Sequence, residues 1–312
     1  MATQKVLVTG GAGFIGSHLT DALVQRGEKV IVVDNLSTGK LENLKTVIDK
    51  IDFIQADLSD SSVAHDALQG CEVVFHHAAV PSVQGSLEDP LICHASGTTA
   101  TVNILWAAAQ AKVRRVIFAA SAAGYGTTNV LPQGETLYPD PQSPYAATKI
   151  AGEFYLRAFS AGLGLDTVSL RYFNIFGPRQ DLKNPYSGVI AIFLEQMAKG
   201  QRPVVFGDGE QTRDFFYVDD AVQANLLAAD SGKPFYGEVL NVGSGQRISI
   251  NQLISEINQV LGTNLAPIYR DERVGEVRHS QADLAKIRNT LGYQPKVSLS
   301  VGLEKMLKSI QE

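Results

Sequence analysis

The stretch KVLVTGGAGFIGSHL, residues 5–19, decides the fold of this chain. It opens with a short β-branched run typical of a buried strand, and a helical pattern from Phe14 to Arg26 follows at once. Between them stand Gly10, Gly13 and Gly16, where glycine permits a tight turn, the close approach of a diphosphate and strand-to-helix packing. The N-terminus of the helix then favours an anion. The stretch therefore predicts a dinucleotide site at the start of a βαβ unit.

The second strand of this unit, Val30 to Asp34, ends on an acidic residue 18 positions after the last glycine of the motif. A carboxylate there can accept both ribose hydroxyls of a dinucleotide but repels a 2′-phosphate. Asn35 follows in place of an arginine, so the residues favour NAD over NADP. Asp57 and Leu58, after the third strand, are placed to border the adenine. The alternative for Asp57 is a helix N-cap.

Strands and helices alternate through the first half of the chain. Further strands are expected at residues 52–55, 72–75, 115–119 and 167–171, with helices such as 94–111 and 143–161 between them. This alternation predicts an α/β Rossmann fold, a doubly wound parallel sheet covered on both faces.

After residue 171 the pattern breaks into proline-containing loops, a helix near 189–199 and a mixed C-terminal segment, which suggests a smaller α/β domain. The strand-like segments 215–218 and 239–242 could return to the main sheet. The domains are therefore expected to interleave. Residues 1–171 and about 214–245 form the NAD-binding domain, and residues 172–213 and 246–312 form the substrate-binding domain.

Composition excludes several classes of protein. With 312 residues, 45% of them hydrophobic, the chain can bury a substantial core. A formal net charge of -5 and the lack of a basic run argue against nucleic acid as a partner. Two cysteines, Cys71 and Cys93, suit a reducing cytoplasm and show no metal-binding spacing. No targeting leader or membrane span is expected, since no stretch approaches ~18 apolar residues.

Three further residues can form a site that removes a proton from an alcohol. Tyr145 and Lys149 are four residues apart in SPYAATK, so on a helix they share one face. A free tyrosine titrates near pH ~10, and a nearby ammonium favours the phenolate and lowers its pKa. Ser121, at a strand end in FAASAAGYG, can hydrogen-bond the same substrate hydroxyl. The alternative for the pair is a solvated helix face.

With these motifs in one sequence, the chain resembles the extended short-chain dehydrogenase/reductase family, in its nucleotide-sugar epimerase branch. The resemblance covers essentially the whole chain, and it is carried by TGGAGFIGSH, DNLSTG, HHAA, SPYAATK, RYFNIFGPRQ, GDGEQTRDFFYVDD and RVGEVRHSQAD. It implies an NAD-dependent UDP-hexose 4-epimerase. Tyr145 would take the proton of the C4 hydroxyl while the C4 hydride passes to the nicotinamide. Lys149 would lower the tyrosine pKa and hold the nicotinamide ribose, and Ser121 would bind the reacting oxygen.

The resemblance also implies two sets of binding residues and no metal ligands. The NAD set is Gly10, Gly13, Phe14, Ile15, Gly16, Asp34, Asn35, Ser37, Thr38, Gly39, Asp57, Leu58, Ala78, Ala79, Tyr145, Lys149 and Tyr172. The UDP-sugar set is Ser82, Ser121, Asn174, Val189, Phe206, Arg213, Arg273, Glu276 and Ser280. In this set Phe206 would border the uracil, and Arg213 and Arg273 would neutralise the diphosphate. The alternative for each arginine is a surface salt bridge.

Departures from the family pattern reduce the number of reactions that the chain is expected to catalyse. Ala122 and Ala123 follow Ser121, where relatives carry further hydroxyls. Related 4,6-dehydratases place an Asp-Glu pair at these positions and related decarboxylases a glutamate, so both reactions lack their acid–base groups here. His94 stands where relatives commonly have an asparagine near the nicotinamide, and it could perturb cofactor contacts or only pack.

His76 and His77 close the fourth strand without a further ligand at metal spacing, so we interpret them as packing residues. Ser280 is the specificity residue by resemblance, since a small residue there gives room for an N-acetyl group at C2 of the sugar. The predicted substrates are UDP-Glc/UDP-Gal and UDP-GlcNAc/UDP-GalNAc. The alternatives are a UDP-glucuronate 4-epimerase, a 4-keto sugar reductase and a non-enzymatic NAD- or nucleotide-sugar-binding regulator.

The resemblance implies a homodimer packed through two helices per subunit, here residues 94–111 and 143–161. Both segments carry many alanines and other apolar residues. Burial inside the monomer would produce the same pattern.

Overall fold

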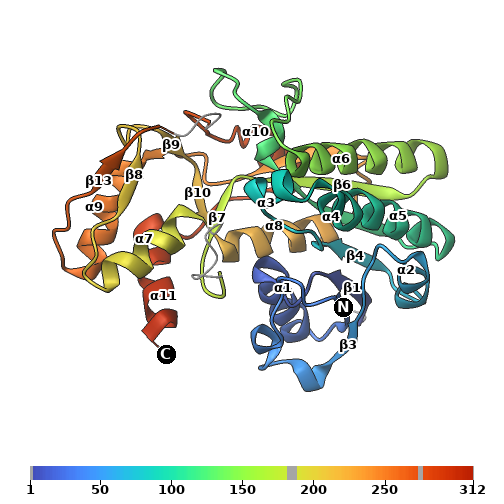
Figure 1. Cartoon of the computed structure of the whole chain (residues 1–312). Coiled ribbons are helices and arrows are strands. Elements are labelled where there is room, and N and C mark those ends of the chain that lie inside the picture. Colours follow the sequence, from blue (N-terminus) through green and yellow to red (C-terminus); the bar gives the residue numbers. More distant parts are fainter. Residues whose placement is uncertain (1–2, 181–187, 273–276, 312) are drawn as a thin grey trace.

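A computed structural model describes residues 3–180, 188–272 and 277–311 of the chain (Figure 1). In this part of the chain, a seven-stranded sheet has the order β11-β6-β5-β4-β1-β2-β3, and every neighbouring pair is parallel. Its strands are β1 Lys5–Thr9, β2 Lys29–Asp34, β3 Ile51–Gln55, β4 Val73–His76, β5 Arg115–Ser121, β6 Asp166–Tyr172 and β11 Glu238–Val242. The predicted doubly wound α/β fold is confirmed. The strand order reverses between β1 and β4, where folds of this class bind their ligands.

Helices cover both faces of this sheet (Figure 1). One face packs against α1 (Phe14–Gln25) and α8 (Val218–Asp230). The other packs against α2 Ser61–Ala67, α5 Ala100–Gln110 and α6 Pro144–Leu163. The side chains of β1 alternate accordingly, with Val6 and Val8 in the first core and Leu7 in the second. Shorter elements connect these layers: η1 Leu41–Leu44, η2 Ile48–Lys50, α3 Val83–Glu88, α4 Pro90–His94, the π-helical η3 Ala95–Thr99 and η4 Ala122–Tyr125.

A third core lies beside the sheet, at the left of Figure 1. It is built around α7 Val189–Ala198, α9 Ile250–Leu261 and α11 Leu299–Gln311. Short strands pair two by two in this region: β7 Asn174–Phe176 with β10 Phe215–Tyr217, β8 Val204–Phe206 with β13 Ile268–Arg270, and β9 Thr212–Arg213 with β12 Ile248–Ser249. Helix α10 spans Ala285–Leu291. None of the helices in the described residues is long and apolar enough to cross a membrane.

The segment 215–218 does not join the main sheet, so that prediction is wrong. Strand β10 pairs with β7, and Val218 already begins α8. The chain returns to the main sheet through the buried face of α8 and then through β11, as predicted for 239–242. The assignment of residues to two domains stays a prediction.

The glycine turn depends on direct contact between backbone atoms. Gly10 has φ +67°, and its N–H donates to the Val33 carbonyl at 2.8 Å. A Cβ on Gly16 would lie 2.2 Å from the Gly10 carbonyl oxygen. Only glycine therefore lets the first turn of α1 rest on the end of β1.

His76, the last residue of β4, is fully buried between the sheet and α5. Its ring nitrogens hydrogen-bond the hydroxyls of Thr9 at 2.7 Å and Thr101 at 3.0 Å, and its ring stacks on Phe118. Burial, followed by the charge of Lys149, lowers its pKa to about 3. The predicted packing role of His76 is confirmed.

We expect Gly16→Ala to lower the free energy of unfolding by ~1–3 kcal/mol, because the new methyl group must push α1 away from Gly10. Urea unfolding followed by circular dichroism measures the change. Gly162→Ala in α6 is the matched control: its Cβ meets no atom within 4 Å, and the change should raise stability by ~0.5–1 kcal/mol. Equal stabilities of the two variants would contradict the backbone contact as the constraint.

Stability should fall below pH 6.5 because His76 is buried neutral. The folded pKa is below the unfolded one, so between pH 6.5 and about 3 the unfolded state binds more protons. The free energy of unfolding then falls by up to ~1.4 kcal/mol per pH unit for this group. His76→Gln should show a shallower slope between pH 7 and 5, whereas His65→Gln, exposed on α2, should keep the wild-type slope. Parallel slopes in all three proteins would sink this explanation.

Candidate active site

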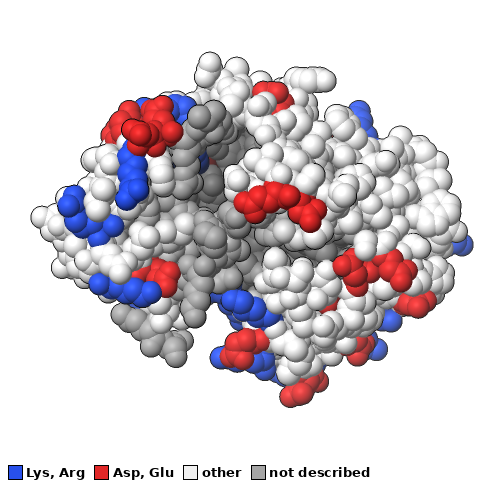
Figure 2. All heavy atoms as spheres, in the orientation of Figure 1, with Lys and Arg blue, Asp and Glu red and all other residues white. Residues whose placement is uncertain are grey.

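A cavity of about 940 Å³ opens at the carboxyl ends of the parallel strands. The glycine turn after β1, Asp34 at the end of β2, Ser121 at the end of β5 and Tyr172 at the end of β6 all line it. On the face shown in Figure 2, basic and acidic side chains of the described residues are interspersed. The volume and the position at the topological switch point suit a dinucleotide with part of a second ligand.

The structure brings all predicted NAD-binding residues to this cavity. Its lining includes Gly10, Gly13, Phe14, Ile15, Gly16, Asp34, Asn35, Ser37, Thr38, Gly39, Asp57, Leu58, Ala78, Ala79, Tyr145, Lys149 and Tyr172. Their individual roles toward a bound cofactor stay predictions.

Asp34 is the acidic residue that faces the cavity from β2. Its carboxylate accepts hydrogen bonds from the backbone N–H groups of Ala12 at 2.9 Å and Leu36 at 2.8 Å, while burial raises its pKa. Each oxygen keeps a further lone pair for a ribose hydroxyl. These contacts fit the adenosine ribose of NAD, and Gly10 and Gly13 line the same cavity at the N-terminus of α1, which favours its diphosphate.

Asp57 holds the loop after β3 and does not cap a helix. Its carboxylate accepts from the Ser59 N–H at 2.8 Å and from the Asn35 side chain at 2.8 Å. The N-cap of α2 is Asp60. The helix-cap alternative for Asp57 is therefore wrong.

Ser121, Tyr145 and Lys149 meet at one wall of the cavity. Ser121 is the last residue of β5, and its Oγ accepts from the Ala123 N–H at 3.2 Å. Tyr145 and Lys149 stand one turn apart near the start of α6, as the spacing predicts. Since both side chains line the cavity, the solvated-face alternative is wrong.

The predicted effect of Lys149 on the pKa of Tyr145 stays a prediction. Lys149 Nζ donates to the Ala119 carbonyl at 2.7 Å and lies 5.9 Å from the centre of the tyrosine ring. Burial raises the pKa of Tyr145, a hydrogen bond with Ser121 opposes this rise, and the nearby Cys93 thiol adds to it. Burial also lowers the pKa of Lys149, to about 8.

Of the predicted UDP-sugar residues, Ser82, Ser121 and Asn174 line the cavity, whereas Val189, Phe206, Arg213 and Ser280 are outside its lining. Arg273 and Glu276 lie outside the described residues. Ser280 is buried, and its hydroxyl lies 3.5 Å from the Gln133 side-chain oxygen.

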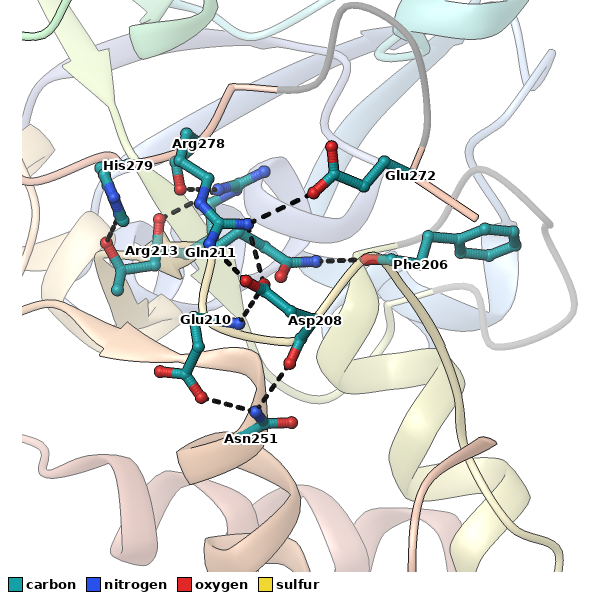
Figure 3. A network of polar contacts seen from close by, with 10 residues as sticks. Phe206, Asp208, Glu210, Gln211, Arg213, Asn251, Glu272, Arg278 and His279 are labelled. Carbon is teal, nitrogen blue, oxygen red and sulfur yellow. Dashed lines mark hydrogen bonds and ion pairs between the residues drawn. The ribbon is translucent and has the colours of Figure 1, made fainter. Parts of the chain in front are cut away.

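A polar network connects the loop from Phe206 to Arg213 with the segment around Arg278, which leads to Ser280 (Figure 3). Arg278 makes a two-pronged ion pair with Asp208, at 2.8 and 2.7 Å. Gln211 Nε2 donates to the Phe206 carbonyl at 2.8 Å. Arg213 Nη1 donates to the Thr212 carbonyl at 3.0 Å. The loop between Phe206 and Arg213 is thereby fixed against the segment that begins near Arg278.

Two other histidines considered in the sequence analysis, His77 and His94, lie in different environments. His77 lines the cavity, donates from Nε2 to Asn225 Oδ1 at 3.2 Å, and stacks on Tyr172. Burial lowers its pKa to about 4. His94, at the end of α4, is exposed and outside the cavity lining, so neither predicted role, cofactor contact or packing, fits it. No group of three or more His, Cys, Asp or Glu residues in the described chain could hold a metal ion.

Sequence reasoning missed part of the lining. Lys40, Asn43, Ser96, Arg179 and Gln180 also border the cavity. Arg179 is the second arginine of RYFNIFGPRQ, after Arg171, and the direction of its side chain depends on a backbone conformation that the sequence does not indicate.

The chain is similar to known proteins over most of its length. Residues 6–243 match the NAD dependent epimerase/dehydratase family. A UDP-N-acetylglucosamine 4-epimerase from Methanobrevibacter ruminantium M1, solved with UDP-N-acetylmuramic acid, is 40% identical with a TM-score of 0.95, over 100% of this chain and 99% of that one. A UDP-glucose 4-epimerase from Thermotoga maritima, solved with UDP-glucose, is 40% identical with a TM-score of 0.93, over 98% of both chains.

A third solved relative contains the cofactor. It is a UDP-glucuronic acid 4-epimerase from Bacillus cereus in complex with UDP-glucuronic acid and NAD, 32% identical with a TM-score of 0.91, over 98% of this chain and 99% of that one. The predicted family and the predicted cofactor, NAD, are confirmed. The chain belongs to the NAD-dependent epimerase/dehydratase family and is an NAD-dependent enzyme.

Proposed function

We propose that this enzyme inverts C4 of a UDP-hexose reversibly, through a transient 4-keto sugar. One observation carries the proposal: Ser121, Tyr145 and Lys149 face the same cavity as the glycine turn and Asp34. A sugar hydroxyl at Tyr145 therefore lies in the same space as the cofactor. NAD, when bound, supplies the hydride acceptor and returns the hydride.

Tyr145 removes the C4 hydroxyl proton, and Ser121 assists. The buried phenol is a weak acid in this cavity, so ionisation needs a partner that favours the anion. The Ser121 hydrogen bond acts in this direction. Lys149 supplies the charge: burial makes its ammonium costly, and a phenolate beside it would offset that cost.

The two residues after Ser121 in the chain favour epimerisation over elimination or decarboxylation. Ala122 and Ala123 begin η4, directly after Ser121, and neither can donate or accept a proton through its side chain. Tyr145 can therefore move a proton at the C4 hydroxyl. Elimination or decarboxylation would need an acid–base group for a second carbon of the sugar, and neither alanine supplies one.

The proposed substrates are UDP-Glc/UDP-Gal and UDP-GlcNAc/UDP-GalNAc. Relatives named for glucose and N-acetylglucosamine both match over nearly the whole chain. The small side chain of Ser280 supports acceptance of the larger C2 substituent. UDP-glucuronate, the substrate in the name of the Bacillus cereus relative, is the competing substrate for the same chemistry. Initial rates with UDP-Glc, UDP-GlcNAc and UDP-glucuronate, without added cofactor, rank the three.

We also propose a homodimer through α4, α5 and α6, which pack side by side. Large apolar side chains of these helices are exposed: Leu91 by 80%, Ile92 by 58%, Trp106 by 54% and Phe154 by 62%. Apolar area gathered on neighbouring helices is typical of a protein interface. A twofold axis would pair this surface with itself.

Tyr145→Phe should lower kcat by ~10²–10⁴-fold, since the general base is lost while the ring still fills its place. Affinity for UDP, measured by calorimetry on the holoenzyme, should stay within a few fold. Tyr155→Phe, half-exposed on the same helix, is the control and should keep full activity. Normal turnover by Tyr145→Phe would refute the mechanism.

Heat-denatured wild type should release about one NAD per chain. If no NAD is released, a reductase that exchanges its cofactor in each cycle is favoured over an epimerase.

Ser280→Tyr should lower kcat/KM for UDP-GlcNAc at least ~10-fold relative to UDP-Glc, because the larger ring takes the room of the N-acetyl group. Competing initial-rate assays with both sugars measure the ratio. Ser280→Ala should leave the ratio unchanged. If Ser280→Tyr reduces both rates equally, Ser280 does not set the C2 preference.

Phe154→Glu should convert the dimer to a monomer, because a charge at the centre of an apolar interface cannot be desolvated cheaply. Sedimentation velocity at micromolar protein reports the mass. Tyr269→Glu, on an exposed part of β13, should remain dimeric. A wild type that sediments as a monomer at all concentrations would exclude the proposed interface.

A further inference from the structure

Arg179 lines the cofactor cavity in a strained backbone conformation. Its φ is +67°, in the left-handed region that residues with a Cβ rarely adopt. Such strain persists where the surroundings hold a residue in place, and it gathers at ligand sites.

The guanidinium of Arg179 is only partly satisfied. Nη2 makes an ion pair with Asp21 on α1 at 2.5 Å. Nη1 is buried and has no hydrogen-bond partner among the described residues. A buried cationic donor without an acceptor is costly, so the orphaned N–H group calls for a ligand atom.

The surroundings of Arg179 are anchored to α1, the helix whose first turn follows the glycine motif. His18 on α1 hydrogen-bonds the Pro178 carbonyl at 3.0 Å. Burial and, to a smaller extent, the charge of Arg179 lower the pKa of His18, while the hydrogen bond to Pro178 opposes this change. Gln180 lines the same cavity, and its side-chain oxygen is also buried, with no hydrogen-bond partner in the part of the chain that the structure describes. An orphaned donor and an orphaned acceptor thus stand in adjacent residues.

We propose that Arg179 is a further cofactor-binding residue, whose free N–H group donates to the diphosphate of NAD while Asp21 holds the guanidinium against α1. The diphosphate is the anionic part of NAD, and it belongs beside the turn at Gly10 and Gly13 in the same cavity. Arginine binds such oxygens through charge-assisted hydrogen bonds. The contact deepens the proposed function, since an epimerase regenerates its NAD in each cycle and gains from retaining it.

Four variants of the holoenzyme test this assignment: Arg179→Met, Arg179→Lys, Asp21→Asn and Arg202→Met. Each is dialysed against NAD-free buffer, and the NAD released by heat is measured per chain over time. Arg179→Met should lose NAD about tenfold faster than wild type or more, because a charge-assisted contact is gone. Arg179→Lys should fall between them. Asp21→Asn keeps the guanidinium group of Arg179, so its rate of NAD loss should stay closer to that of the wild type. Arg202→Met, exposed and bonded only to carbonyls of Ala266 and Pro267 in the hydrogen bonds described, should match wild type.

Wild-type retention of NAD by Arg179→Met would overturn the proposal. Equal losses in Arg179→Met and Asp21→Asn would also overturn it, because the ion pair with α1 would then explain the effect. Retention of NAD does not require turnover of a sugar. The proposed Arg179 contact and the proposed epimerase reaction can therefore be refuted independently. A wild type inactive on every UDP-hexose, with faster NAD loss in Arg179→Met, would sink the proposed reaction and leave the contact standing.

Discussion

The approach of Gly16 to the carbonyl of Gly10 is the contact on which the rest of this structure depends. It places the N-terminus of α1 directly over the end of β1, with no side chain between them. Asp34 on the next strand then accepts from the Ala12 N–H at 2.9 Å, which fixes the turn relative to β2. One backbone contact thereby sets the distance between the diphosphate end and the ribose end of the cofactor cavity.

Helix α6, which carries Tyr145 and Lys149, is held to the same sheet by buried polar contacts. Lys149 donates to the Ala119 carbonyl of β5, and Glu153, one turn later, accepts from Arg171 of β6 at 2.9 Å. Arg171 also lies over the ring of Tyr125, 4.4 Å from its centre. These contacts bury charge, and burial is what weakens the acidity of Tyr145 and lowers the pKa of Lys149. In the proposed mechanism, a phenolate–ammonium pair would offset this unfavourable burial.

Sequence patterns predicted the parts of the fold that local rules govern. Strand and helix periods located the sheet, and the glycines with Asp34 located a cavity that all predicted NAD residues line. Interactions between segments that are far apart in the sequence were harder to predict. The segment 215–218 has strand composition, but its pairing depends on where β7 lies. Lys149 has the right spacing from Tyr145, yet a carbonyl of another element takes its ammonium. Arg179 depends on a left-handed φ at a residue whose type gives no hint of it.

In the proposed reaction, hydride leaves C4 and returns to the same carbon within one enzyme molecule. Epimerisation in D₂O, followed by NMR of the product sugar, shows whether this hydrogen exchanges with solvent. C4 of the product should carry no deuterium, because the hydrogen travels as hydride on a retained NAD and never meets solvent. Stoichiometric deuterium at C4 would contradict it, since the hydrogen would then have left as a proton.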